Sequence, residues 1–229
     1  MKKPYIVCHM MTSIDGRIDC AMTAKLEGVD DYYTTLDALN VDATLSGRVT
    51  AELELALPGK FAVKNYQPLG TESFSKKVDS KSFEVVVDTK GTLLWKDDKD
   101  YEDPHIIITS ENVSTEYLSY LDAKNISWIA CGKSKINLNR AVEILAEKFN
   151  VERLAIVGGA LINGAFLDAG LLDEISILIG LGVDARKGMP AALDGLPAER
   201  EPFKLKLADV KTFESGAVWL RYKCVMRNA

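Results

Sequence analysis

The sequence has no excess of positive charge and no long hydrophobic run. Lysine and arginine number 28 and aspartate and glutamate 33, which leaves a net charge of −5 over 229 residues. A protein that binds nucleic acid normally needs a basic surface, so this balance argues against a nucleic-acid partner. No stretch approaches the roughly 18 apolar residues of a membrane-spanning helix, and we therefore expect no membrane contact.

Cysteine is scarce and scattered. No two cysteines form a C-x-x-C pair, and none lies in a local cluster with histidine, so we expect no metal site and no redox motif. We expect no disulfides and four reduced, buried thiols. The apolar run near the start ends too early for a secretory leader, and we expect a cytosolic protein. The cysteines are Cys8, Cys20, Cys131 and Cys224.

Short apolar segments alternate with segments of helical periodicity along most of the chain. This alternation predicts helical crossovers and a mainly parallel sheet. Strands are expected at residues 5–11, 43–46, 83–87, 105–109, 126–131, 154–157 and 174–179. Helices are expected at residues 29–39, 49–57, 115–123, 139–149 and 160–169. The polar stretch of residues 60–82 is expected to be one long loop.

The end of the chain has a different pattern. Residues 204–213 and 217–226 flank a Glu-Ser-Gly turn, which is typical of an antiparallel hairpin. The sequence contains no internal repeat, no low-complexity segment and no linker. We therefore predict a single α/β domain over residues 1–229, with a mainly parallel sheet and a C-terminal antiparallel hairpin.

A strand that ends in two glycines and runs directly into a helix is the strongest local signal. Gly158 and Gly159 can adopt backbone angles closed to other residues, and they let a ligand approach the main chain. The free N–H groups and the dipole of the following helix would favour a phosphate there. The alternative is a tight turn without a ligand, and an isolated glycine pair does not distinguish the two.

A second segment, Gly47-Arg48-Val49-Thr50, also lies where a strand meets a helix. Gly47 permits close approach, Thr50 offers a hydroxyl, and Arg48 can donate two hydrogen bonds to one phosphate. A surface arginine on an ordinary turn is the alternative. Two such segments favour a ligand with several phosphates, because ligands of open α/β sheets bind outside the carboxyl ends of the strands.

A third segment, residues 12–18, places Asp15 beside a glycine where the first strand ends. A carboxylate there suits a reactive site, although an Asp-Gly turn is also common. Residues 180–185 match G-x-G-x-x-A, but the helix-breaking residues that follow lead us to reject a dinucleotide fingerprint. His9 and His105 lie in apolar strands and are expected in the core rather than in catalysis.

Together the three segments resemble the dihydrofolate-reductase-like superfamily, and most closely the RibD C-terminal family of riboflavin-biosynthesis reductase domains. Residues 12–18 match its T/S-x-D-G-[KR]-I motif, residues 47–50 its G-x-x-T motif, and residues 87–89 a strand ending in D-[ST]. The most specific element, A-F-L-x-A-G-L-[VL]-D-E, is matched by residues 165–174. The resemblance covers nearly the whole chain. It implies a three-layer α/β/α fold and a reductase domain without a deaminase domain.

The resemblance also implies NADPH as cofactor and hydride transfer to a C=N or C=O bond of a small, heterocyclic substrate. Asp15 is expected to supply the proton, with water as the alternative. The 2′-phosphate is expected at Arg48 and Thr89, and the nicotinamide near residues 13–18. A homodimer is the implied assembly. The cofactor-binding residues are expected to be Thr12, Ser13, Gly16, Ile18, Gly47, Arg48, Thr50, Thr89, Gly158, Gly159, Ala160, Leu161 and Ile162.

Two departures from the family pattern leave the substrate open. Val157 replaces the usual glutamate before the glycine pair, and residues 51–60 lack the Asp-x-Pro segment that the family uses for a ribose phosphate. One possibility is the riboflavin-pathway reaction itself, reduction of 5-amino-6-(5-phosphoribosylamino)uracil. The others are reduction of a different heterocycle or carbonyl compound, and a nucleotide-binding module without turnover.

Overall fold

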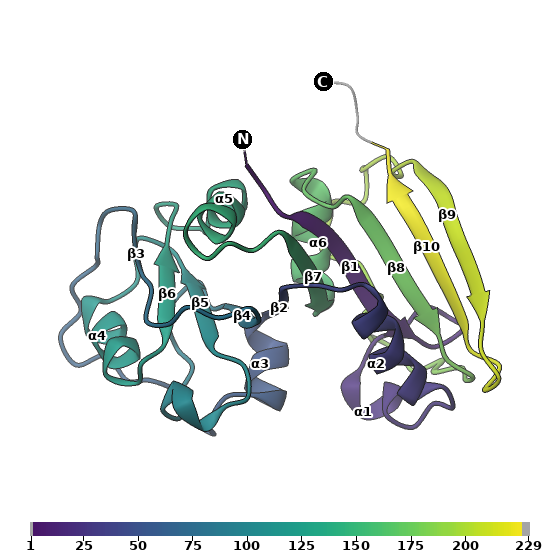
Figure 1. Ribbon diagram of the computed structural model, residues 1–229, viewed down its shortest axis with the longest axis horizontal. Helices are drawn as coiled ribbons and strands as arrows, with labels where there is room; N and C mark the ends of the chain where they lie inside the picture. Colours follow the sequence, from purple (N-terminus) through teal and green to yellow (C-terminus); the bar gives the residue numbers. More distant parts are fainter. Residues whose placement is uncertain (1, 226–229) are drawn as a thin grey trace. The chain divides into compact units, whose positions relative to one another are not determined.

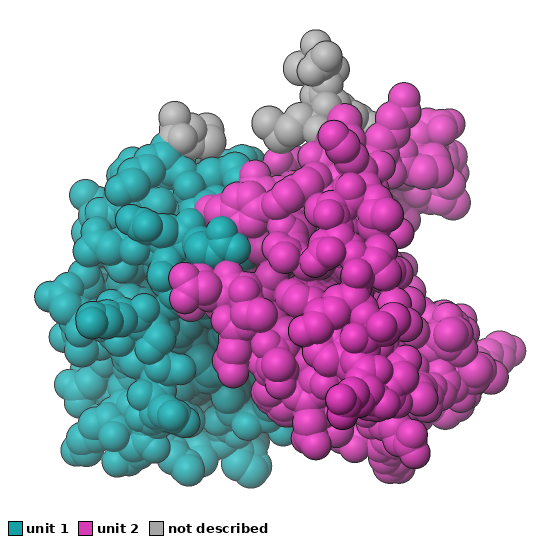
Figure 2. All heavy atoms as spheres, turned by 45° about the vertical axis from the view of Figure 1, so that its right-hand side comes forward, with its two compact units in different colours: residues 1–4, 42–154 teal, residues 5–41, 155–229 magenta. Residues whose placement is uncertain are grey.

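The computed structural model describes residues 2–225, and the chain divides into two compact units, coloured separately in Figure 2. Unit 1 comprises residues 1–4 and 42–154, and unit 2 comprises residues 5–41 and 155–229. Each unit is thus assembled from separate stretches of chain. The single domain expected over residues 1–229 stays a prediction, and Met226, the expected end of the last strand, lies outside the described residues.

The strands of unit 1 lie in the order β3-β6-β5-β4-β2. Neighbouring strands from β2 to β6 are parallel, as the alternating pattern predicts. The outermost strand, β3, is antiparallel to β6. The strands are β2 (Ala43–Gly47), β3 (Ser73–Ser75), β4 (Phe83–Val87), β5 (His105–Thr109) and β6 (Ser127–Ala130).

Two details of unit 1 differ from the prediction. Residues 60–82 do not form one loop, contrary to expectation, since strand β3 interrupts them. Three residues are too few to show a strand period in the sequence, and β3 is defined by its pairing with β6. The helix expected at residues 49–57 ends at Glu54, since the N–H of Leu57 bonds the carbonyl of Leu94, 2.8 Å away, in an isolated bridge.

Helices cover both faces of the unit 1 sheet. Val86 of β4 belongs to a core cluster with side chains of α3 and α4, such as Ala51 and Tyr117. Phe83 points to the opposite face, because side chains alternate along a strand, and it packs against Phe149 at the end of α5. Three layers result. The helices are α3 (Arg48–Glu54), α4 (Thr115–Ala123) and α5 (Leu138–Lys148), with a 3-10 turn at Asp98–Asp100.

Unit 2 has the strand order β7-β1-β8-β10-β9. Strands β1 and β8 are parallel, whereas β10 is antiparallel to both β8 and β9, which confirms the C-terminal hairpin. Figure 1 shows this hairpin in yellow and α2 packed against β1 and β8. The strands are β1 (Tyr5–Thr12), β7 (Arg153–Gly158), β8 (Glu174–Ile179), β9 (Leu205–Thr212) and β10 (Val218–Cys224). The helices are α1 (Cys20–Thr23), α2 (Val29–Ala38) and α6 (Ala160–Asp168).

Both histidines lie in the core, as expected. His9 contacts the hydroxyls of Ser176 and Thr35 at 2.9 and 3.2 Å, and burial lowers the pKa of its imidazole to about 4. Burial disfavours the charged form of His105, but Asp98, 2.9 Å away, together with Glu84 raises its pKa overall. Neither ring is exposed to solvent, so neither is placed to contact a substrate.

All four cysteines are free. Cys8 and Cys131 are buried and Cys224 is half-buried, but Cys20 is exposed because it begins the short surface helix α1. The expectation of burial is therefore wrong for Cys20. Over residues 2–225, no helix combines the length and the apolar character needed to cross a membrane.

Candidate functional site

The loop after β1, residues 13–18, is called here the Asp15 loop. The hydroxyl of Ser13 donates a hydrogen bond of 2.7 Å to Asp15, and the N–H of Arg17 donates one of 3.2 Å back to that hydroxyl. Gly16 has a φ of +75°, which closes the turn in the left-handed region that favours glycine. The segment is therefore an Asp-Gly turn whose carboxylate is held in a fixed direction.

Asp15 accepts two further hydrogen bonds from a segment far along the chain. The N–H groups of Asp184 and Ala185 lie 3.0 and 3.1 Å from its two carboxylate oxygens. The hydrogen bond from Ser13, together with these backbone N–H groups, lowers the pKa of Asp15 to about 2. The Asp15 carboxylate is thus held ionised at neutral pH.

The glycine pair lies between β7 and α6 and is joined by a cis peptide bond. Gly158 has a φ of +134° and so needs glycine, whereas Gly159 is extended, with φ −89° and ψ −172°, a conformation open to any residue. The expectation of special backbone angles is therefore correct for Gly158 and wrong for Gly159. Gly159 is the N-cap of α6, with no side-chain cap and no acidic residue in the first turn.

Residues 192–194 connect the start of α6 to the Asp15 loop. The N–H of Asp194 donates to the carbonyl of Ala160 (3.1 Å), and the N–H of Ala192 donates to the carbonyl of Gly16 (3.1 Å). A Cβ on Gly164 of α6 would lie 2.0 Å from the carbonyl oxygen of Asp194, so this crossing requires glycine. The structure thus brings together two of the three predicted segments within unit 2.

The remaining predicted residues lie in unit 1, at the carboxyl ends of two paired strands. Gly47 at the end of β2 is opposite Val87 at the end of β4, so Arg48 and Thr89 follow neighbouring strands at one edge of the sheet. The Arg48 guanidinium is 2.6 Å from Glu52 of its own helix. An exposed pair of this kind stabilises by at most about 1 kcal/mol, so it leaves Arg48 available to a phosphate.

The sequence prediction missed one element of unit 2, residues 182–192, called here the strap. It contains Asp184 and Arg186, and its partners in the Asp15 loop are some 170 positions earlier in the chain. The G-x-G-x-x-A pattern was correctly rejected, since no helix follows it. The signal that could have indicated this element is a pair of opposite charges two positions apart, Asp184 and Arg186, in an irregular segment that contains glycine.

No group of three or more potential metal ligands gathers anywhere in residues 2–225. A site built from these residues therefore offers hydrogen-bond donors, one fixed carboxylate and the open start of a helix. Such a set can bind phosphates and orient a reactive ring, and the hydride of a reduction would come from a bound cofactor.

Comparison with known proteins identifies the family. The sequence matches the RibD C-terminal domain over residues 4–219. A pyrimidine reductase-like protein from Corynebacterium diphtheriae is 18% identical with a TM-score of 0.72, covering 98% of this chain and 93% of that one. The riboflavin biosynthesis reductase Rib7 of Saccharomyces cerevisiae is 18% identical with a TM-score of 0.64, covering 97% and 90%.

A third structure, RibD of Acinetobacter baumannii, is 18% identical with a TM-score of 0.65. The alignment covers 97% of this chain but only 58% of that protein. At these identities the structures show a shared fold, and this is the dihydrofolate-reductase-like fold that the sequence motifs imply. With the match over residues 4–219, the chain belongs to the RibD C-terminal domain family and is an oxidoreductase of that family.

Proposed function

We propose that the protein is an NADPH-dependent reductase that transfers hydride to a C=N or C=O bond of a small, heterocyclic substrate. One observation carries this proposal: in unit 2 the open start of α6 is tied through residues 192–194 to a loop that holds an ionised carboxylate. The family uses a nicotinamide cofactor, and these two features suit its phosphates and its reactive end, respectively.

The residues fit the phosphates of such a cofactor. The first-turn N–H groups of α6 face no side-chain cap or acidic residue; that of Ile162 donates to the carbonyl of Gly159 at 3.1 Å, which leaves those of Ala160 and Leu161 for a phosphate. Leu161 is 71% exposed, which leaves this turn open to a ligand. Helix α3 of unit 1 also begins at a glycine, Gly47, without a side-chain cap or an acidic first turn. For unit 2 we propose that the start of α6 binds phosphate, and for unit 1, taken by itself, that the start of α3 does so with the help of the hydroxyl of Thr50.

At the Asp15 loop we propose an orienting role. Thr12, Ser13 and Ile18 are almost fully buried and fix the main chain, so that the loop can present Gly16 and Asp15 to the nicotinamide and the substrate. When bound, the cofactor supplies hydride to the electrophilic carbon, and the attached nitrogen or oxygen takes a proton. Because Asp15 is ionised, we propose that this proton comes from water while the carboxylate orients the substrate.

The leading candidate substrate is 5-amino-6-(5-phosphoribosylamino)uracil. In support, a protein from Thermotoga maritima with the same fold is described as a deaminase and reductase whose reductase acts on this compound. Two other matches are described as a pyrimidine reductase-like protein and a riboflavin biosynthesis reductase. The test is a panel of reducible pyrimidines, pteridines and imines assayed by the loss of NADPH absorbance. Turnover of one member supports the reductase. Tight NADPH binding without any turnover would instead favour a nucleotide-binding module.

Cofactor preference gives a sharper test. We expect NADPH to bind roughly ten- to a hundredfold more tightly than NADH, since a hydrogen bond to a charged group contributes about 1.5–3 kcal/mol. Arg48→Ala should remove most of this difference and leave the NADH affinity unchanged. Titrations followed by protein fluorescence give the four dissociation constants.

Glu52→Gln is the matched control, because it removes the partner of Arg48 but keeps the arginine. We expect this variant to bind NADPH at least as tightly as the unmutated protein. Equal affinities of the unmutated protein for NADPH and NADH would contradict the assignment of the 2′-phosphate to Arg48 and Thr89.

We further propose a homodimer, supported by an uncovered apolar face of the C-terminal hairpin. Leu205, Leu207 and Val210 of β9 are 41%, 53% and 50% exposed. Their partners in register on β10 are Cys224, Tyr222 and Leu220, respectively. A second copy would cover this face, as isologous dimers do. We also propose a cytosolic location, which the four free cysteines support.

Sedimentation velocity checks the dimer. We expect a mass twice the 25.2 kDa of one chain, and a monomer for Leu207→Lys, which places a charge in the apolar face. Lys206→Gln is the control, because its side chain alternates to the other face of β9. If the unmutated protein is monomeric at micromolar concentration, the proposed homodimer is contradicted.

A further inference from the structure

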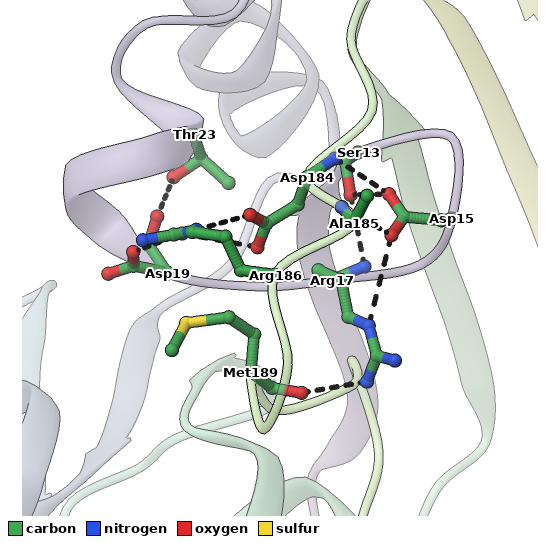
Figure 3. Close-up of polar contacts among 9 residues, drawn as sticks. All are labelled: Ser13, Asp15, Arg17, Asp19, Thr23, Asp184, Ala185, Arg186 and Met189. Atoms are coloured by element: carbon green, nitrogen blue, oxygen red, sulfur yellow. Dashed lines mark hydrogen bonds and ion pairs between the residues drawn. The ribbon is translucent and has the colours of Figure 1, made fainter.

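The strap and the Asp15 loop are joined along their length. The N–H of Ile14 donates to the carbonyl of Gly182 at 2.8 Å, and the N–H of Ile18 donates to that of Pro190 at 3.0 Å. Between these ends, the Arg17 guanidinium donates to the carbonyl of Met189 at 2.7 Å. Figure 3 shows the two segments side by side, with the Arg17 contact below and the Asp15 contacts above. The loop therefore keeps its shape only while the strap stays in place.

Asp184 of the strap brings a second carboxylate close to Asp15. Asp184 lies on the strap with only 1% of its side chain exposed, and its own N–H bonds Asp15, so two carboxylates are held close together. The hydrogen bond from Arg186 lowers the pKa of Asp184 overall, against burial and the negative charge of Asp15, which both act to raise it.

Arg186 is the cation that pairs with Asp184, and it also reaches the residue that follows the Asp15 loop. Its guanidinium contacts both carboxylate oxygens of Asp184, and its Nη2 is 2.7 Å from Asp19, just beyond the Asp15 loop. Arg186 thus contacts Asp184 within the strap and joins the strap to Asp19, the residue that directly follows the Asp15 loop (Figure 3). Arg17, the other arginine in the view, contacts Asp15 only at 3.9 Å.

We propose that Arg186 is a positioning residue of the reductase: by holding the strap against the Asp15 loop, it fixes the Asp15 carboxylate in the orientation needed for hydride transfer. This inference rests on the proposed function and adds to it a residue outside the family motifs. Arg186 acts through Asp184 and the strap, and it need not touch the substrate. The phosphates of the cofactor are proposed to bind elsewhere, at the helix starts, so cofactor affinity should depend little on Arg186.

The test compares Arg186→Ala, Arg186→Lys and the control Lys187→Ala, which alters the neighbouring exposed cation. Hydrogen exchange measured by mass spectrometry should be at least tenfold faster over residues 14–18 in Arg186→Ala and unchanged in Lys187→Ala. With 5-amino-6-(5-phosphoribosylamino)uracil, or whichever panel member is reduced, kcat should fall at least tenfold while the dissociation constant of NADPH changes less than threefold. Arg186→Lys, which keeps the charge but loses the fork, should recover part of kcat.

A double variant, Asp15→Asn with Arg186→Ala, distinguishes positioning from general destabilisation. If Arg186 acts through Asp15, the double variant should be no slower than Asp15→Asn alone. Unchanged exchange and unchanged kcat in Arg186→Ala overturn the proposal, and so do additive losses in the double variant. If the unmutated protein reduces no panel member, the proposed function is what fails, and the exchange rates still decide whether Arg186 holds the loop.

Discussion

Glu174→Gln is expected to lower the free energy of unfolding by about 3 kcal/mol, with urea denaturation as the measurement. Glu174 begins β8 and its side chain is fully buried. Its carboxylate accepts hydrogen bonds from Tyr5 at 2.8 Å, from Arg221 at 2.5 Å and from Lys223 at 2.7 Å. The amide of glutamine keeps the shape but leaves two cations without their counter-charge.

The size of this effect follows from the exposure of the partners. Breaking a fully buried ion pair typically costs about 3–5 kcal/mol. The side chains of Arg221 and Lys223 are 26% and 49% exposed, so water can solvate part of the orphaned charge, and we expect the low end of that range. Asp168→Asn is the control, because it breaks an exposed pair with Arg200 and should change stability by less than about 1 kcal/mol.

The stabilising effect of Glu174 should depend on pH, and the shift of its pKa gives the direction of that dependence. Burial acts to raise the pKa of Glu174, but hydrogen bonds from Arg221, Lys223 and Tyr5 outweigh it and hold the pKa below its ordinary value. Its stabilising effect is therefore present above the pKa of the unfolded chain and is lost as the pH falls through the lowered folded-state value. The difference between Glu174→Gln and the unmutated protein should shrink in acid. A constant difference from pH 7 to pH 3 would contradict this account.

The same residue shows what a sequence motif can and cannot reveal. Asp173 and Glu174 end the most specific motif of the family, yet both serve the fold: Asp173 accepts from the N–H of Ile6 at 2.8 Å and so joins β8 to β1. The motif thus identified the family and the strand without marking a reactive group. Its Ala165 to Gly170 portion lies on α6 and its C-terminal turn, which positions the glycine pair.

Strand and helix positions could be predicted because each depends on local apolar spacing, as β4 and α4 show by matching the predicted ranges. Strand β3 and the strap could not, because each is defined by a partner distant in sequence. The electrostatic state of Asp15 was equally out of reach, since two of its hydrogen bonds come from residues 184 and 185. The proton-donor role expected for Asp15 stays a prediction.

Gly159→Val is expected to abolish NADPH binding, with at least a hundredfold loss of affinity, while the protein stays folded. Gly159 precedes the first turn of α6, and its lack of a side chain lets a phosphate lie against the main-chain N–H groups. The branched side chain of valine would occupy that space. The backbone at Gly159 is extended, with φ −89°, which valine readily adopts. The substitution should therefore change the free energy of unfolding by less than about 1 kcal/mol through backbone strain.

Fluorescence titration with NADPH and the melting temperature of this one variant separate the two interpretations of the glycine pair. Gly170→Ala is the matched control at the other end of α6: Gly170 has φ +67° and open space around it, so alanine should lower stability by about 1 kcal/mol without affecting NADPH. A phosphate site predicts lost binding in Gly159→Val and intact binding in Gly170→Ala. If Gly159→Val binds NADPH normally, whatever its stability, the pair serves only a tight turn, and the phosphates must bind elsewhere.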